Sequence, residues 1–384
     1  VIDRSGTSAE KVEGLKHIWG RTDLIPLWVA DMDFATAPFV TDAIRKRCEN
    51  EVLGYTGKPD SYYNAIINWV KQRYDLIVTK EVINFVPGIV PGIGMAMNCF
   101  TQKGDKVMIQ PPVYHPFAWV TTRNERTLVT NPLKWENGMY RMDLDTFREQ
   151  IKVCKLFILC NPHNPGGVVW TEAELRAIAD ICYDEKVLVF SDEIHADLTL
   201  PPDTHRPFAT VSEKARMNSV TFMSPSKAFN MPGLSASHAL IFNEDLRKRF
   251  RIYMDAGELD MGHVFAFLSV EAAYSHGTEW LDQCLAYIQG NIDFVDEFLK
   301  KHAPKIKAIR PEASYLVWLD CRELELSQKD LNEFFVDKAH LALNDGEMFG
   351  KEGIGFMRLN VASPRCIIEK AMKQLADAYQ LYIK

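Results

Sequence analysis

Short runs of apolar residues recur along the first two thirds of the chain, and a polar loop follows each run. Four of these runs predict strands at residues 106–110, 155–160, 187–190 and 219–223. Because the runs are continuous and not alternating, they favour strands that are buried on both faces of a sheet.

A helix is predicted between the second and third of these strands. Thr171 and Glu174 have the spacing of a capping box, and apolar positions recur at helical spacing from Leu175 to Cys182. Strand, helix and strand in this order indicate βαβ units and therefore an α/β fold with a mostly parallel sheet. Ligands of such sheets bind beyond the carboxyl ends of the strands, where the polar loops of this chain lie.

The carboxyl-terminal third has a different pattern. Residues 271–301 are largely helical by period, short strand candidates follow at 315–319, 341–343 and 355–361, and an amphipathic helix spans about 367–379. We therefore predict three parts: an N-terminal arm (1–45) that contributes to the small domain, a large α/β domain (46–280), and a smaller α+β domain (281–384).

Composition narrows the possible partners and compartments. Lys and Arg total 44 against 51 Asp and Glu, and this net charge of −7 argues against nucleic acid or an anionic membrane as the main partner. The eight cysteines form no C-x-x-C pair, which speaks against a zinc ribbon and favours reduced thiols in the cytoplasm. No apolar run approaches the roughly 18 residues of a transmembrane helix.

Two candidate reactive groups follow predicted strands. Lys227 lies among small residues, and a lysine drawn into an apolar site has a lowered pKa and can act as a nucleophile. Asp192 ends the run at 187–190 and offers a carboxylate at the same sheet edge. Taken alone, Lys227 is more simply interpreted as a solvated loop lysine, and Asp192 as a helix cap.

Four further features add to this pattern. The glycine-rich segment 87–94 precedes an apolar helix and leaves backbone N–H groups free for an anion, although a plain turn also explains it. Asn164 lies between a histidine and a proline, and Tyr114 offers an aromatic face. Arg358, inside an apolar strand, needs a carboxylate partner or an internal salt bridge. The acidic and histidine residues at 192–197 match no metal-binding spacing, so we expect no metal.

The order of these residues resembles that of fold type I pyridoxal-phosphate enzymes, the aspartate aminotransferase superfamily. Within it the chain looks like the carbon–sulfur lyases related to cystathionine β-lyase and cystalysin, which are grouped with class I/II aminotransferases. The resemblance covers about residues 28–365. The stretches that carry it are LWVADMDF (27–34), LGYTG (53–57), SDEIHADL (191–198), SPSKAFN (224–230) and FMRLNV (356–361).

The resemblance implies pyridoxal 5′-phosphate as the cofactor and a role for each matching residue. Lys227 is then the Schiff-base lysine and the base at the substrate Cα, and Asp192 pairs with the pyridine nitrogen. Asn164 then faces the phenolic oxygen, His195 stands where aminotransferases usually have a tyrosine, and Tyr114 stacks on the ring. The phosphate is bound by the backbone of Ile89 and Val90, by Ser224, and by Tyr55 of the neighbouring subunit. Arg358 and Ala30 bind the substrate. A homodimer with a shared active site is also implied.

The implied reaction is α,β-elimination of cystathionine or an S-substituted L-cysteine to pyruvate, ammonia and a thiol. Two positions depart from related enzymes. Ser235 stands where many aminotransferases have an arginine on the phosphate, which favours the lyase branch, and His115 stands where close relatives often have a second tyrosine. An L-amino-acid aminotransferase remains the nearest alternative, and a regulatory or binding protein that retains the fold is a remote one.

Overall fold

The computed structural model describes residues 1–382, and its largest element is a seven-stranded sheet. The strand order is β2-β10-β9-β8-β7-β3-β4, and only β10 runs antiparallel to its neighbours. The α/β fold class is therefore confirmed. The strands are β2 (Ile83–Val86), β3 (Lys106–Ile109), β4 (Thr127–Thr130), β7 (Leu156–Cys160), β8 (Leu188–Asp192), β9 (Ser219–Met223) and β10 (Ser237–Leu240).

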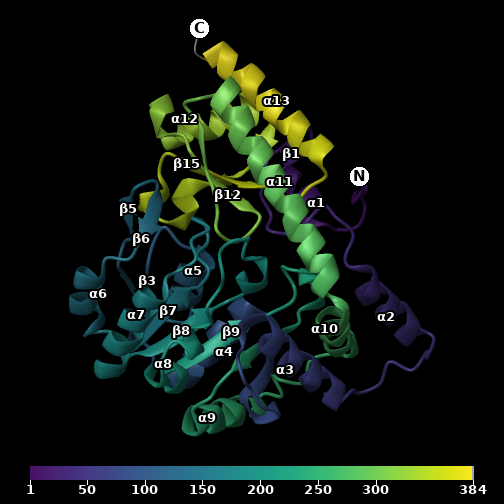
Figure 1. Ribbon diagram of the computed structural model, residues 1–384, viewed down its shortest axis with the longest axis vertical. Coiled ribbons are helices and arrows are strands. Elements are labelled where there is room, and N and C mark those ends of the chain that lie inside the picture. Colours follow the sequence, from purple (N-terminus) through teal and green to yellow (C-terminus); the bar gives the residue numbers. More distant parts are fainter. Residues whose placement is uncertain (383–384) are drawn as a thin grey trace.

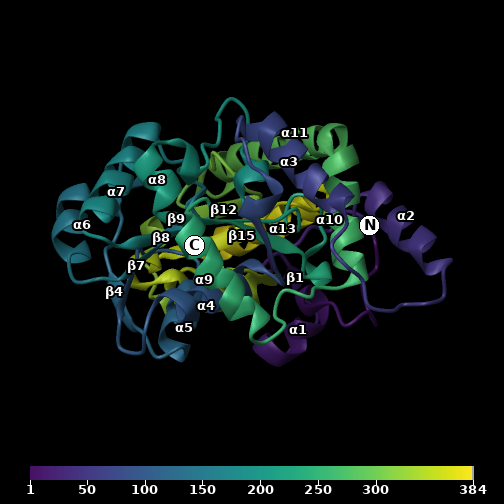
Figure 2. The ribbon, with the colours of Figure 1, turned by 90° about the horizontal axis from the view of Figure 1, so that it is seen from below.

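Helices cover both faces of this sheet (Figure 2), which is why β7 and β9 are buried throughout. One face carries α6 (Leu144–Ile151), α7 (Glu172–Asp184) and α8 (Glu213–Met217), and the other α4 (Ile89–Phe100), α5 (Pro116–Arg123) and α9 (Glu244–Asp255). Beside the sheet lie α2 (Pro38–Cys48), α3 (Asp60–Tyr74) and α10 (Val264–His276), and a hairpin joins β5 (Lys134–Glu136) to β6 (Met139–Arg141).

The four predicted strands are all present, with bounds that differ by at most two residues. The predicted capping box is also present. The Thr171 hydroxyl accepts from the Glu174 amide at 3.2 Å, and the Glu174 carboxylate accepts from the Thr171 amide at 2.9 Å. Helix α7 therefore begins where the sequence predicts it.

A second sheet, in the order β11-β12-β15-β14, lies in the carboxyl-terminal third. It consists of β11 (Lys307–Ile309), β12 (Leu316–Asp320), β14 (Asn344–Asp345) and β15 (Phe356–Asn360), accompanied by α11 (Thr278–His302), α12 (Gln328–Glu333) and α13 (Arg365–Tyr382). The long helix α11 extends from these elements to α10 (Figure 1). The predicted helical stretch divides at Gly277, where a Cβ would lie 2.2 Å from the Ala273 carbonyl oxygen.

The N-terminal residues pack against this carboxyl-terminal part. Strand β1 (Ile25–Pro26) pairs in parallel with β13 (Leu341–Ala342), and α1 (Glu10–Trp19) lies beside β1. A small cluster of Leu15, Leu24 and Ala342 supports this contact. The pairing agrees with an arm that contributes to a small domain, although the domain bounds themselves stay a prediction. No helix within residues 1–382 is both long and apolar enough for a membrane span.

Candidate active site

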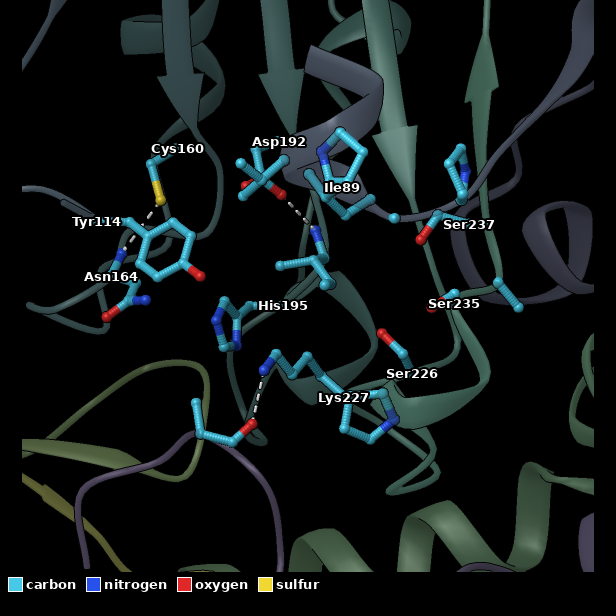
Figure 3. Close-up of a pocket in the computed structure, with 18 residues that line it drawn as sticks. Ile89, Tyr114, Cys160, Asn164, Asp192, His195, Ser226, Lys227, Ser235 and Ser237 are labelled. Carbon is cyan, nitrogen blue, oxygen red and sulfur yellow. Dashed lines mark hydrogen bonds between the residues drawn. The ribbon is translucent and has the colours of Figure 1, made fainter. Parts of the chain in front are cut away.

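A cavity of about 210 Å³ lies beyond the carboxyl ends of β7, β8 and β9. Apolar side chains and a few converging polar groups line it, as they do in small-molecule sites. Figure 3 shows side chains from several elements pointing into it. The predicted site residues among its lining are Ala30, Ile89, Val90, Tyr114, Asn164, Asp192, His195 and Lys227.

The amino terminus of α4 forms one end of this cavity. Ile89 and Val90 are the first two residues of the helix, and their N–H groups precede the first intrahelical hydrogen bond, from the Gly92 amide to the Gly88 carbonyl. The preceding Gly88 has φ +147°, which disfavours a side chain. The hydroxyl-bearing Ser226, Ser235 and Ser237 also line the cavity. These donors, with the helix dipole, suit a phosphate.

Asp192 is the last residue of β8 and is 4% exposed. One carboxylate oxygen accepts from the Ile194 amide at 3.1 Å. Burial disfavours the charged form and raises the pKa of Asp192 to about 7, although the Ile194 amide acts in the opposite direction. Such a carboxyl group retains its charge best beside a cationic partner, such as a protonated ring nitrogen.

Lys227 lies in the loop after β9 and points into the cavity (Figure 3). Its Nζ donates to the Ala30 carbonyl oxygen at 2.6 Å. Burial, and next the positive charge of Arg358, lower the pKa of Lys227 to about 8. The interpretation of Lys227 as a solvated loop lysine is therefore wrong, and a substantial fraction of the amine is neutral near pH 8.

Arg358 on β15 is buried without any carboxylate partner among residues 1–382. Its two Nη atoms donate to neutral oxygens only: Asn164 Oδ1 at 3.0 Å, Asn344 Oδ1 at 2.5 Å and the Trp28 carbonyl at 3.2 Å. Its Nε has no hydrogen-bond partner, and burial lowers the pKa of the group to about 10. The internal salt bridge is thus excluded within these residues, and a ligand anion would complete the site.

The remaining cavity groups are aromatic or neutral. Tyr114 provides a wall of the cavity, and Asn164 directs its Nδ2 toward the interior (Figure 3). His195 has a buried Nδ1 without a partner in residues 1–382, and burial lowers its pKa to about 3, so the imidazole is neutral. Flat aromatic and neutral surfaces suit a planar heterocycle.

Arg358 does not itself line the cavity but donates to Asn164, which does. Two further predicted residues lie outside the cavity. The Ser224 hydroxyl donates to the Ala236 carbonyl at 2.7 Å, while Ser226, two residues on, lines the cavity. Tyr55 is 99% exposed and does not line the cavity of its own chain. The phosphate role of both residues stays a prediction. Sequence reasoning missed Ser226 and Ser237 as lining groups, although Ser226 directly precedes Lys227 in the quoted motif.

The donor set fits pyridoxal 5′-phosphate. The α4 terminus and the serine hydroxyls offer an anion site, Tyr114 an aromatic face, and Asp192 a carboxyl group for a ring nitrogen. Lys227 supplies a partly neutral amine for the aldehyde, and the free Nδ2 of Asn164 suits a phenolic oxygen. These groups belong to one cavity and can act on a single ligand.

Comparison with known proteins agrees with this geometry. A family model described as aminotransferase class I and II matches residues 22–375. Cystathionine beta-lyase PatB of Bacillus subtilis is 37% identical, over 98% of each chain. Cystalysin from Treponema denticola, which contains pyridoxal 5′-phosphate, matches with a TM-score of 0.96 at 33% identity, covering 100% of this chain and 98% of its own. The PLP-bound C–S lyase from Staphylococcus hominis has a TM-score of 0.91 at 34% identity, covering 99% and 97%.

The resemblance inferred from the motifs is therefore confirmed. The family model spans most of the residues, and relatives above 30% identity cover nearly the whole length. The cavity described above lies within the matched region. The chain belongs to the aminotransferase class I and II family.

Proposed function

We propose that the protein is a pyridoxal-phosphate-dependent carbon–sulfur β-lyase. It cleaves cystathionine or an S-substituted L-cysteine and releases a thiol, pyruvate and ammonia. Support comes from PatB, described as a cystathionine beta-lyase, and from the C–S lyase of similar structure. The observation that carries the proposal is a partly neutral lysine amine and a buried carboxyl group in one cavity lining. A guanidinium without a carboxylate partner, that of Arg358, donates to Asn164 of the same lining.

Each part of the site then has a task. Arg358 binds the substrate α-carboxylate, because its guanidinium has no charged partner within residues 1–382. Asp192 holds the cofactor's ring nitrogen protonated, and the amides of Ile89 and Val90 bind its phosphate. When bound, the cofactor supplies an electron sink for the negative charge that develops at Cα.

Lys227 acts as the base. Its Nζ takes the proton from the substrate Cα as the Cα–H bond breaks, and the Cβ–S bond then breaks with its electron pair leaving on sulfur. The thiolate departs, and the three-carbon remainder is released and hydrolysed to pyruvate and ammonia. Ser235, which lines the cavity where many aminotransferases have an arginine, favours elimination over transamination.

The test is to supply cystathionine or S-methylcysteine to cofactor-loaded enzyme without any keto acid. We expect pyruvate and a free thiol in equal amounts, and none from the Lys227→Ala variant. If well-folded enzyme forms no pyruvate and converts amino acids only when a keto acid is added, the protein is an aminotransferase and the lyase proposal is rejected.

We also propose a homodimer in the cytoplasm, with Tyr55 reaching the phosphate of the neighbouring subunit. Support for the dimer is the near-complete exposure of Tyr55 and the exposure of its apolar neighbours Val52 and Leu53, because exposed apolar groups that cluster mark interfaces. All eight cysteines are free, as expected in a reducing compartment. Sedimentation analysis of the holoenzyme tests the dimer, and a monomer at micromolar concentration would exclude it.

A further inference from the structure

Ala30, in the segment 28–34, lines the cavity beside Lys227. Side chains from distant parts of the chain bind the carbonyl groups of this segment. Asn360 Nδ2 donates to the carbonyls of Val29 and Asp31 at 2.7 Å each. Asn230 Nδ2 donates to those of Met32 and Phe34 at 3.0 and 2.8 Å. The position of this backbone is therefore set by several independent contacts.

The carbonyl of Ala30, at the centre of this segment, receives two donors. One is Lys227 Nζ at 2.6 Å, and the other is the hydroxyl of Tyr315 at 2.9 Å. A carbonyl oxygen has two lone pairs, so both are used. Tyr315 precedes β12 and is 0% exposed, so its ring is held by the core and its hydroxyl has little freedom to move. Tyr315, Ala30 and Lys227 form a hydrogen-bonded chain.

These hydrogen bonds bear on proton transfer, because the amine that would remove the Cα proton is the one that donates to the Ala30 carbonyl. A neutral amine that donates one N–H to the Ala30 carbonyl keeps its lone pair available for the Cα proton. A base that is itself oriented by a third group is a recurring arrangement in catalysis. We propose that Tyr315 is a positioning residue: its hydroxyl fixes the Ala30 carbonyl, which in turn orients the Lys227 amine toward the substrate Cα.

This inference rests on the proposed function and assigns the proton step to a defined geometry. The Cα–H bond breaks, its electron pair stays on the substrate carbon, and the proton moves to the lone pair of Lys227 Nζ. Asn360 continues to hold the flanking carbonyls when the Tyr315 hydroxyl is removed, so the effect should concentrate at Ala30. The charged or titratable groups that face Lys227 are Asp31, Asp192, His195 and Arg358.

Steady-state kinetics of Tyr315→Phe provide the first test. We expect kcat to fall by roughly 10- to 100-fold with KM changed less than about threefold, since misplacement of a base acts on the transition state. The primary deuterium isotope effect with α-deuterated S-methylcysteine should increase, because proton removal becomes more rate-limiting. Tyr62→Phe is the matched control, since Tyr62 is equally buried and its hydroxyl has no partner within residues 1–382.

A second test measures the hydrogen bonding of Tyr315, Ala30 and Lys227 without the lyase reaction. The acetylation rate of Lys227 in the apoenzyme is measured against pH by peptide mass spectrometry. Without the Tyr315 hydroxyl, the Ala30 carbonyl accepts from Lys227 alone and binds the ammonium form better. We expect the midpoint in Tyr315→Phe to rise by up to about one pH unit, the equivalent of one neutral hydrogen bond. The Tyr62→Phe midpoint should match the wild type.

The two measurements separate the proposals. A wild-type enzyme that releases no pyruvate rejects the lyase assignment, whereas the acetylation midpoints still report on the contact. Replacement of Tyr315 by 4-aminophenylalanine keeps a donor at the same place and should restore kcat, and it is the variant to use if Tyr315→Phe does not fold. The positioning role is overturned if Tyr315→Phe matches Tyr62→Phe in kcat, isotope effect and midpoint, or if the 4-aminophenylalanine enzyme is as slow as Tyr315→Phe.

Discussion

Asp192 couples the chemistry of the site to the stability of the folded chain. Its pKa is 3.8 in the unfolded reference and about 7 in the folded protein because of burial. Between these two values the folded state binds more protons than the unfolded state, so the stability contributed by this group is present below pH 3.8 and is lost as pH rises to about 7. A site that needs this carboxyl therefore makes the apoenzyme less stable at neutral pH.

Replacing Asp192 by Asn should remove this loss of stability at neutral pH. We expect the apoenzyme of Asp192→Asn to be more stable than wild type at pH 8, by on the order of 2–4 kcal/mol, and to differ little from it near pH 4. The same variant should lose most of its lyase activity. Urea unfolding of both apoenzymes at the two pH values measures this, with the exposed Asp42→Asn as control. Equal stabilities of wild type and Asp192→Asn at pH 8 would contradict the expectation.

At the scale of elements, the amino terminus of α4 combines a glycine with positive φ and two free N–H groups. In Gly88→Ala the backbone would be strained at φ +147°, and the added Cβ would lie 3.3 Å from Pro91 Cδ. We expect the turn to shift and the affinity for pyridoxal 5′-phosphate, measured by titration of the apoenzyme, to fall by at least about tenfold, the equivalent of one lost hydrogen bond.

The matched control for this prediction is Gly104→Ala. Gly104 also has a positive φ, +84°, but a Cβ added there would meet no atom within 4 Å, and the residue does not line the cavity. Gly104→Ala should therefore destabilise the fold by about 1 kcal/mol without weakening cofactor binding. Equal losses of affinity in both variants would show that α4 has no special part in anion binding.

The cap of helix α7 does not contact the site, so its contribution to stability can be measured separately. Thr171→Ala removes the hydroxyl that accepts from the Glu174 amide, and the free energy of unfolding should fall by about 1 kcal/mol. Thr171→Ser keeps that acceptor and should lose far less. Denaturant unfolding measures both, and kcat should be unchanged in both. A fall in kcat in Thr171→Ala would mean that α7 influences the cavity.

At the scale of the whole molecule, a shared active site predicts complementation between subunits. Lys227→Ala and Tyr55→Ala damage different halves of such a site, so a mixed dimer contains one site that has both residues. We expect Lys227→Ala alone to be inactive and Tyr55→Ala alone to be weakly active. The mixture, after unfolding and refolding together, should regain lyase activity at saturating substrate. A mixture no more active than the average of its components would place Tyr55 outside the neighbouring site.

The local pattern of the chain is enough to predict several features. Continuous apolar runs mark the central strands, and Thr171 with Glu174 marks the start of α7. Lys227 and Asp192 are expected together because the carboxyl ends of parallel strands meet at one edge of a sheet. The motifs around them identify the family, since they carry chemistry that only a few folds arrange in that order.

Only the tertiary structure decided which groups surround those residues. Arg358 and Trp28 are 330 positions apart, and nothing local indicates that the guanidinium binds the Trp28 carbonyl and two asparagines in place of a carboxylate. Tyr315 and Ala30, which share a hydrogen bond, are 285 positions apart. The cavity is lined by Ser226, whereas the sequence suggests Ser224. Strand propensity and capping act over a few residues and can be predicted from the sequence, whereas the contacts of a side chain depend on how distant elements pack.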